Sequence, residues 1–204
     1  MPNKLPHFED ANRILFKIVV GPFDNNSYVL ACRKTGIAAL VDAANEPERI
    51  LDVASEFDLR YVLTTHGHHD HVQAVTEVRE RTGAAVGIHR ADASSIPSGP
   101  DFYIEHEQIF EIGNVSLKAL HTPGHTPGST CFVTEGLLFS GDTLFPGGPG
   151  NTWGNRDAFA TIIESIKTSL FVLPETTLVL PGHGLDTTIG AEKPHLDEWI
   201  ERGW

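Results

Sequence analysis

Four short motifs of this sequence place histidine or aspartate directly after an apolar, strand-like segment. They read HGHHDH after YVLTT, TPGHTPGS after LKALH, SGDTLF around the end of LLFSG, and PGHG after LVL. Loops at strand ends often carry the chemistry of folds that contain a sheet, because the rigid sheet can aim side chains from them. We therefore expect a fold in which these four strand ends converge on one place.

The sequence predicts a run of strands followed by helices, and this order occurs twice along the chain. The expected strands are residues 14–20, 27–32, 37–43, 61–65, 114–120, 129–136, 137–141 and 176–184. Helical spacing of apolar residues predicts helices over 45–57, 71–83 and 157–171, with Asn45 as the N-cap of the first.

One α+β domain, residues 1–204, with two sheets packed face to face and helices outside, satisfies this order. A doubly wound βαβ sheet fits less well, because too many strands follow one another without a helix.

Charge and composition narrow the expected partners. The net charge is −12, from 27 acidic and 15 basic residues without a Lys/Arg block, which disfavours nucleic acid or an anionic membrane surface. The first residues, MPNKLPHFEDANR, lack the apolar run of a signal peptide, and no stretch reaches the roughly 18 apolar residues of a membrane span. Cys32 and Cys131 are too few for a cysteine zinc site. As buried thiols they fit a reducing compartment, so we expect a cytoplasmic protein.

Spacing within HGHHDH divides its side chains between two directions. His66 and His68 are two apart in an extended segment, so they point the same way and can share one ion. Asp70 and His71 fall where the next helix begins, and they therefore project elsewhere. His69 points away from the first pair, and we expect it to be a bystander.

Two ions need more ligands than this motif supplies. Zinc in catalytic sites usually has three protein ligands and one position for water. His125 is expected to complete the first group and His183 the second. Asp142 has two oxygens and can bridge both ions at a separation of roughly 3.5–4 Å. We expect two divalent ions, with zinc favoured, although such ligands also hold iron or manganese.

In this order and at comparable spacing, the four motifs resemble those of the metallo-β-lactamase superfamily. HGHHDH matches its HxHxDH signature, and Asp42, which ends the strand IAALVDA, matches an early aspartate that supports the ligands. The similarity spans residues 42–184 and points to the short glyoxalase II-like hydrolases. It implies an αββα sandwich, two mixed β-sheets flanked by helices, with a two-metal site in the groove between the sheets.

This resemblance implies hydrolysis by metal-activated water, with Asp70 and Asp142 in the catalytic machinery. The expected substrate is a small thioester, and the reaction is hydroxyacyl-thiol hydrolysis. Alternatives stay open: a persulfide dioxygenase with one iron, a lactone or ester hydrolase, or a metal-binding module without catalysis. Asp70, His71 and His183 favour the hydrolase, because a one-metal enzyme does not need them as ligands.

The loop after Asp142 departs from the glyoxalase II-like pattern. Related enzymes have a glutathione-binding Lys or an Arg-Ser/Thr-Asp run there, and this chain reads TLFPGGPGNTWGNRDAF instead. We expect Asn151, Trp153 and Arg156 to line the substrate groove, with Trp153 against an apolar or flat portion. A purely structural Gly/Pro turn is the alternative, and the thiol carrier stays open.

Overall fold

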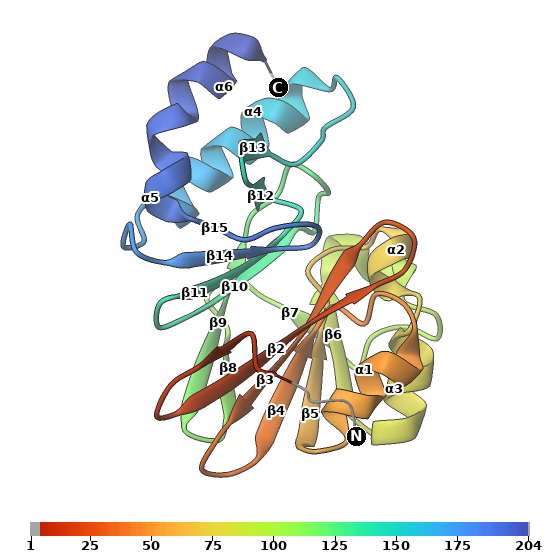
Figure 1. Ribbon diagram of the computed structural model, residues 1–204. Helices are drawn as coiled ribbons and strands as arrows, with labels where there is room; N and C mark the ends of the chain where they lie inside the picture. Colours follow the sequence, from red (N-terminus) through yellow and green to blue (C-terminus); the bar gives the residue numbers. More distant parts are fainter. Residues whose placement is uncertain (1–4, 204) are drawn as a thin grey trace.

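The computed structural model describes residues 5–203, and two β-sheets pack against each other at its centre (Figure 1). The seven strands of the first sheet lie in sequence order. They are β1 (Phe8–Glu9), β2 (Arg13–Val20), β3 (Asn25–Cys32), β4 (Ile37–Val41), β5 (Asp58–Leu63), β6 (Ala85–His89) and β7 (Phe102–Ile104). β1 to β4 pair antiparallel and β4 to β7 pair parallel, so the sheet is mixed.

The second sheet is also mixed and has the strand order β15-β14-β11-β10-β9-β8, in which only β11 and β14 pair in parallel. Its strands are β8 (Ile109–Ile112), β9 (Val115–His121), β10 (Thr130–Thr134), β11 (Leu137–Gly141), β14 (Leu178–Pro181) and β15 (Thr187–Thr188). A short hairpin of β12 (Leu144–Phe145) and β13 (Gly148–Pro149) follows β11.

Helices cover the outer faces of both sheets (Figure 1). The first sheet carries α1 (Pro47–Ala54), α2 (His69–Val72) and α3 (Val75–Thr82), with the 3₁₀ helix η1 (Arg90–Ser95) after β6. The second carries α4 (Arg156–Ser165), its π-helical continuation η2 (Ile166–Leu170), α5 (Ile189–Glu192), η3 (Lys193–His195) and α6 (Leu196–Arg202). This arrangement confirms the expected αββα sandwich.

Neighbouring strand residues pack into different cores, which explains why the strands read as continuous apolar runs. On β11, Leu138 packs under the C-terminal helices and Phe139 packs between the sheets. On β14, Val179 and Leu180 divide in the same way. Because side chains alternate across a strand, a sheet that is covered on both faces needs apolar residues at every position.

Two local expectations for the helices were wrong. The helix expected over 71–83 is interrupted, because the amides of Gln73 and Ala74 bind the carbonyls of Ala44 and Ala43 at 3.1 and 3.0 Å. These bonds tie α2 and α3 to the loop after β4. The N-cap position of α1 belongs to Glu46, at φ 47°, and not to the preceding asparagine.

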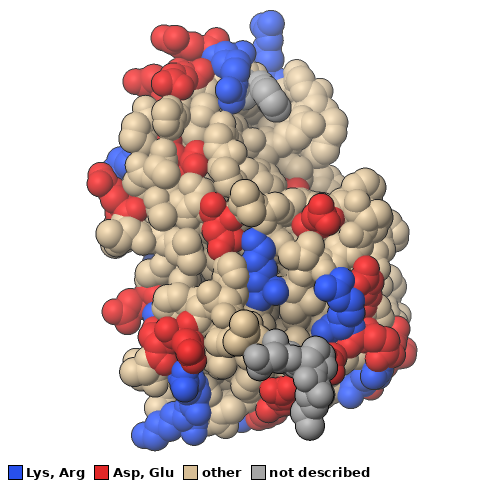
Figure 2. Space-filling model, viewed as in Figure 1, with Lys and Arg blue, Asp and Glu red and all other residues tan. Residues whose placement is uncertain are grey.

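Charged side chains of both signs are scattered over the face shown in Figure 2, and Lys and Arg form no continuous patch there. Within residues 5–203, no helix is long and apolar enough to cross a membrane.

Candidate metal centre

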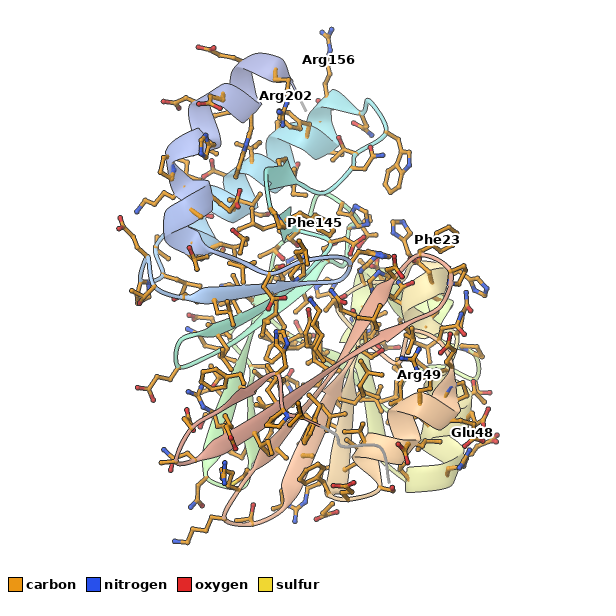
Figure 3. The ribbon with its side chains drawn as sticks, in the orientation of Figure 1. Phe23, Glu48, Arg49, Phe145, Arg156 and Arg202 are labelled. Carbon is orange, nitrogen blue, oxygen red and sulfur yellow. The ribbon has the colours of Figure 1, made fainter. Side chains whose placement is uncertain are left out.

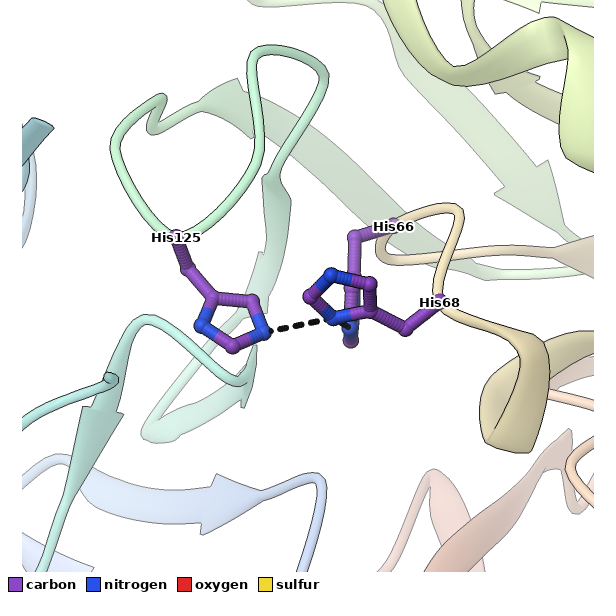
Figure 4. Close-up of side chains that lie close together, drawn as sticks. All are labelled: His66, His68 and His125. Atoms are coloured by element: carbon purple, nitrogen blue, oxygen red, sulfur yellow. Dashed lines mark hydrogen bonds between the residues drawn. The ribbon is translucent and has the colours of Figure 1, made fainter. Parts of the chain in front are cut away.

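One group of candidate ligands joins the two sheets. His66 and His68 follow β5 of the first sheet, and His125 lies in the loop after β9 of the second (Figure 4). Nδ1 of His68 lies 3.0 Å from Nε2 of His66 and 2.9 Å from Nε2 of His125. These separations are close to the roughly 3.3 Å between ligand atoms of a tetrahedral zinc ion with Zn–N bonds of about 2.0–2.1 Å. The three nitrogens can therefore hold one ion.

A second group forms from Asp70, His71 and His183. The first two lie in the short helix α2, and His183 follows β14. Nε2 of His183 lies 3.1 Å from Nε2 of His71 and 3.3 Å from Oδ2 of Asp70. Two imidazole nitrogens and a carboxylate oxygen thus face one another, as a second divalent ion requires.

Asp142, which follows β11, stands between the two groups. Its Oδ2 is 3.5 Å from Nε2 of His125 and also 3.5 Å from Nε2 of His183, so it faces one histidine of each group. Its Oδ1 lies 3.4 Å from Nε2 of His71, is buried and accepts no hydrogen bond from the described residues. A buried carboxylate oxygen without a donor is costly. A shared cation would compensate this cost, so the residues fit a metal centre.

Behind the centre, the carboxylate of Asp42 orients two of the histidines. It is 1% exposed and accepts the Thr65 amide and the Thr65 hydroxyl, both at 2.7 Å. Its Oδ2 is also 2.8 Å from Nδ1 of His71, and the Thr65 hydroxyl lies 3.0 Å from Nδ1 of His66. These contacts at Nδ1 turn Nε2 of both rings toward the ligand groups.

Backbone carbonyls orient two further histidines in the same way. Nδ1 of His125 donates to the carbonyl of Asn151 at 2.9 Å, and Nδ1 of His183 donates to the carbonyl of Phe23 at 2.8 Å. Both rings consequently present Nε2 to the centre. Because any residue has a carbonyl, no side-chain pattern in the sequence could have indicated these two contacts.

Burial and neighbouring charges set the protonation of the centre. Burial lowers the pKa of His66 well below its ordinary value and lowers that of His125, so both rings are neutral and able to bind metal. At His71, burial is outweighed by the nearby Asp42 and Asp142, and the pKa rises to about 9. At Asp142, burial is outweighed by His183 and the other histidines, and the pKa falls well below its ordinary value. The bridging carboxylate therefore stays ionised.

Two residues of this region differ in their relation to the centre. His69 is exposed, and within the described chain it belongs neither to the two ligand groups nor to the cluster of His66, His71 and Asp142 that joins them. Asn25 was not expected in the centre, yet its Nδ2 donates to Oδ2 of Asp70 at 3.0 Å and lies 3.5 Å from Nε2 of His183. The three polar residues that open β3, before its apolar half, are the sequence signal that could have indicated it.

Of the three expected groove residues, Trp153 is the one whose side chain packs against the ligand histidines. Its ring packs 5.3 Å from that of His68 and 5.2 Å from that of His125, and it remains 65% exposed. Asn151 acts through its backbone carbonyl, and its side chain accepts the Trp153 amide at 2.7 Å. Arg156 instead lines a neighbouring cavity with Arg202, and Figure 3 shows it extending from the far end of α4, away from the centre.

A cavity of about 450 Å³ adjoins the first ligand group. Its lining includes His125, Trp153, Thr152 and Pro127, and none of its lining residues is acidic, lysine or arginine. Phe145 and Phe23, which are labelled in Figure 3, both lie beside His183. The ring of Phe145 is 6.4 Å from that of His183, and the carbonyl of Phe23 accepts its Nδ1–H. The surface around the metal centre, which we call its entrance, is therefore aromatic and largely uncharged on these two sides.

The fold and the centre together define a metal-binding αββα protein whose ligands come from the ends of strands in both sheets. The family model described as Metallo-beta-lactamase superfamily matches residues 20–183. The chain therefore belongs to the metallo-β-lactamase superfamily, which is hydrolytic and whose fold binds divalent metals.

Individual relatives show which members of the superfamily this chain resembles. Hydroxyacylglutathione hydrolase GloC of Haemophilus influenzae is 35% identical over 178 residues, which cover 76% of this chain and 84% of GloC. The crystal structure of ETHE1 from Myxococcus xanthus superposes with a TM-score of 0.82 at 29% identity and covers 93% of this chain and 89% of that one. The crystal structure of TTHA1623 in a di-iron-bound form superposes with a TM-score of 0.74 at 29% identity. The match covers 87% of this chain and 96% of TTHA1623.

Proposed function

We propose that this protein is a metal-dependent thioester hydrolase of the hydroxyacylglutathione hydrolase type. The observation that carries the proposal is the pair of ligand groups that Asp142 joins beside an uncharged cavity. The 35% identity to GloC supports the same reaction.

Two divalent ions in these groups would supply a water of lowered pKa and polarise the carbonyl of the substrate. The chain contributes the fixed geometry. Asp142 faces both groups, and Asn25 holds the carboxylate of Asp70 through a hydrogen bond at 3.0 Å. Burial raises the pKa of Asp70, but the Asn25 amide and His71 outweigh it, so the pKa lies below its ordinary value. Asp70 therefore remains an acceptor that can orient the attacking water.

The protonation of the two aspartates favours a thioester over an oxygen ester or an amide. Asp70 and Asp142 both have lowered pKa values, so neither carboxyl can donate a proton near neutral pH. A thiolate leaves without a general acid, because the pKa of a thiol is only about 8.5. An alkoxide or an amine needs protonation as it leaves.

Aromatic side chains around the centre support a substrate with a small, weakly charged acyl portion. Trp153 and Phe23 are 65% and 66% exposed. Trp153 packs against His68 and His125, and Phe23 contacts His183 through its carbonyl, so both offer flat apolar surfaces beside the ligands. The cavity beside Trp153 has room for one end of such a molecule. We assign the thiol carrier to the glutathione class on the likeness to GloC.

Zinc is the proposed metal, because its preferred ligands and tetrahedral geometry fit three nitrogens at these separations. Iron is the second candidate, since TTHA1623 was solved in a di-iron-bound form. Nitrogen and carboxylate ligands accept both metals.

Protein purified without chelators tests the proposal. We expect two metal equivalents per chain and thiol release from S-lactoylglutathione at a higher kcat/KM than ring opening of a lactone or cleavage of an oxygen ester of the same acid. Metal without turnover of any of these substrates would contradict the enzyme assignment. Faster turnover of the lactone would contradict the substrate class.

A further inference from the structure

Asp92 is a buried carboxylate that has no part in the reaction described above. It lies in η1, directly after β6, and is 8% exposed. Among residues 5–203 it belongs to neither ligand group and does not join the cluster around Asp142, so its role is not that of a candidate ligand.

Three hydrogen bonds join Asp92 to both loops that carry the first histidine group. Oδ2 accepts the amide of Gly67 at 2.9 Å and the hydroxyl of Thr126 at 2.6 Å. Oδ1 accepts the amide of Gly128 at 3.0 Å. Gly67 stands between two of the ligand histidines, and Thr126 directly follows the third. One carboxylate thus links a loop of the first sheet to a loop of the second.

The two loops pack tightly against Asp92. A Cβ on Gly128 would lie 2.5 Å from Cγ of Asp92, and one on Gly67 would lie 3.0 Å from its Cβ and 2.9 Å from Oγ of Ser95. Ser95 itself donates to the carbonyl of Asp92 at 2.8 Å, which fastens the 3₁₀ turn. A shift of Asp92 therefore moves both loops.

Only a carboxylate satisfies all three contacts. Both oxygens of Asp92 face donors, and an ionised carboxylate accepts at both positions. The amide of an asparagine has the same shape, but its NH₂ group would face the backbone N–H of Gly67 in one orientation and that of Gly128 in the other. Asp92→Asn therefore breaks the link on one side while it preserves the volume.

We propose that Asp92 is a positioning residue that sets the metal affinity of the first group by fixing the separation of the histidines in its two loops. It acts through the loops and does not touch the ion. The proposal rests on the metal centre and not on the reaction. Its test is therefore independent of the assignment as a thioester hydrolase.

Zinc titration of metal-free protein against a chelating dye tests the proposal in two backgrounds. His183→Ala removes a ligand of the second group and leaves the first to be measured. His68→Ala removes a ligand of the first group and leaves the second to be measured. In the His183→Ala background, Asp92→Asn should raise the zinc dissociation constant about 10- to 100-fold, the range for residues that orient metal ligands. In the His68→Ala background, the constant should not change.

Asp101→Asn is the matched control. Its carboxylate accepts the amide of Val86 at 2.7 Å and pairs with Arg79, but it contacts neither loop. It should leave both constants unchanged, which separates loop positioning from a general loss of stability. An unchanged constant for the first group in Asp92→Asn, or an equal rise in both backgrounds, would overturn the proposal.

Thr126 provides the test if Asp92→Asn does not fold. Thr126→Val removes one of the three donors at constant volume, and Thr126→Ser keeps the hydroxyl. The valine variant should weaken zinc binding in the His183→Ala background, and the serine variant should restore it. Equal constants for the two variants would overturn the proposal.

Discussion

A single methyl group at Gly182 is expected to displace the carboxylate that the two ligand groups share. In Gly182→Ala the new Cβ would lie 2.3 Å from Oδ1 of Asp142 and 2.7 Å from Cε1 of His71. The backbone cannot retreat easily, because the Gly182 amide binds the Gly141 carbonyl at 2.8 Å and its carbonyl binds the Asn26 amide at 2.7 Å. The carboxylate must move by at least about 0.7 Å, the difference between 2.3 Å and the 3.0 Å below which Cβ contacts are essentially never seen.

A misplacement of about 1 Å at a reacting centre can lower the rate about 100-fold. We therefore expect Gly182→Ala to lose about 100-fold in kcat/KM on the thioester and to bind fewer than two metal equivalents. Gly190→Ala is the matched control, because its Cβ would press on Glu175 at 3.0 Å far from the ligands. Metal analysis, steady-state kinetics and thermal unfolding of both variants provide the comparison. Two bound metals and an unchanged kcat/KM in Gly182→Ala would refute the role of the shared carboxylate.

Three further predictions follow from the centre and its entrance. His68→Ala should lose metal, whereas His69→Ala should lose almost none, because His69 is exposed and outside the ligand groups; equal loss in both variants would contradict the division. Trp153→Ala should raise KM at constant metal content, and Arg156→Ala should not, because only Trp153 packs on the ligand histidines; equal kinetics would remove Trp153 from the substrate groove. The pKa of His71 is raised to about 9 in the metal-free protein, so its stabilising effect is complete below about pH 6.5 and is lost as the pH rises through 9. Denaturant unfolding should show that the free energy of unfolding of the metal-free protein falls over this pH range, whereas that of metal-free His71→Gln does not. The same pH profile in both proteins would contradict the raised pKa of His71.

The sequence predicted the sandwich because the relevant signals are local. Strands covered on both faces need apolar runs, and β4, β14, the second half of β3 and the first three residues of β11 have them. Short elements with mixed composition escaped prediction. β7 has three residues, and α6 buries only Trp199 among polar neighbours, so neither shows a clear period.

The candidate ligands were identifiable because histidine and aspartate at strand ends are themselves the signal. The residues that orient them carry no such signal, because their role arises from contacts between distant segments. Asp92 lies in RADASS, which has no metal motif, and it meets the loops only in the folded chain. The direction of the Arg156 side chain could not be predicted for a related reason: α4 begins at this residue, and the helix carries the side chain away from the centre.

Isotope labelling tests the central claim, hydrolysis by metal-activated water, most directly. S-lactoylglutathione is incubated with the protein in ¹⁸O-water under strict anaerobiosis, and the lactate is analysed by mass spectrometry. The account predicts one ¹⁸O atom in each product carboxylate, at the same rate as in air, with two metal equivalents per chain. Oxygen uptake with glutathione persulfide, together with one iron per chain and no thioester cleavage, would contradict it.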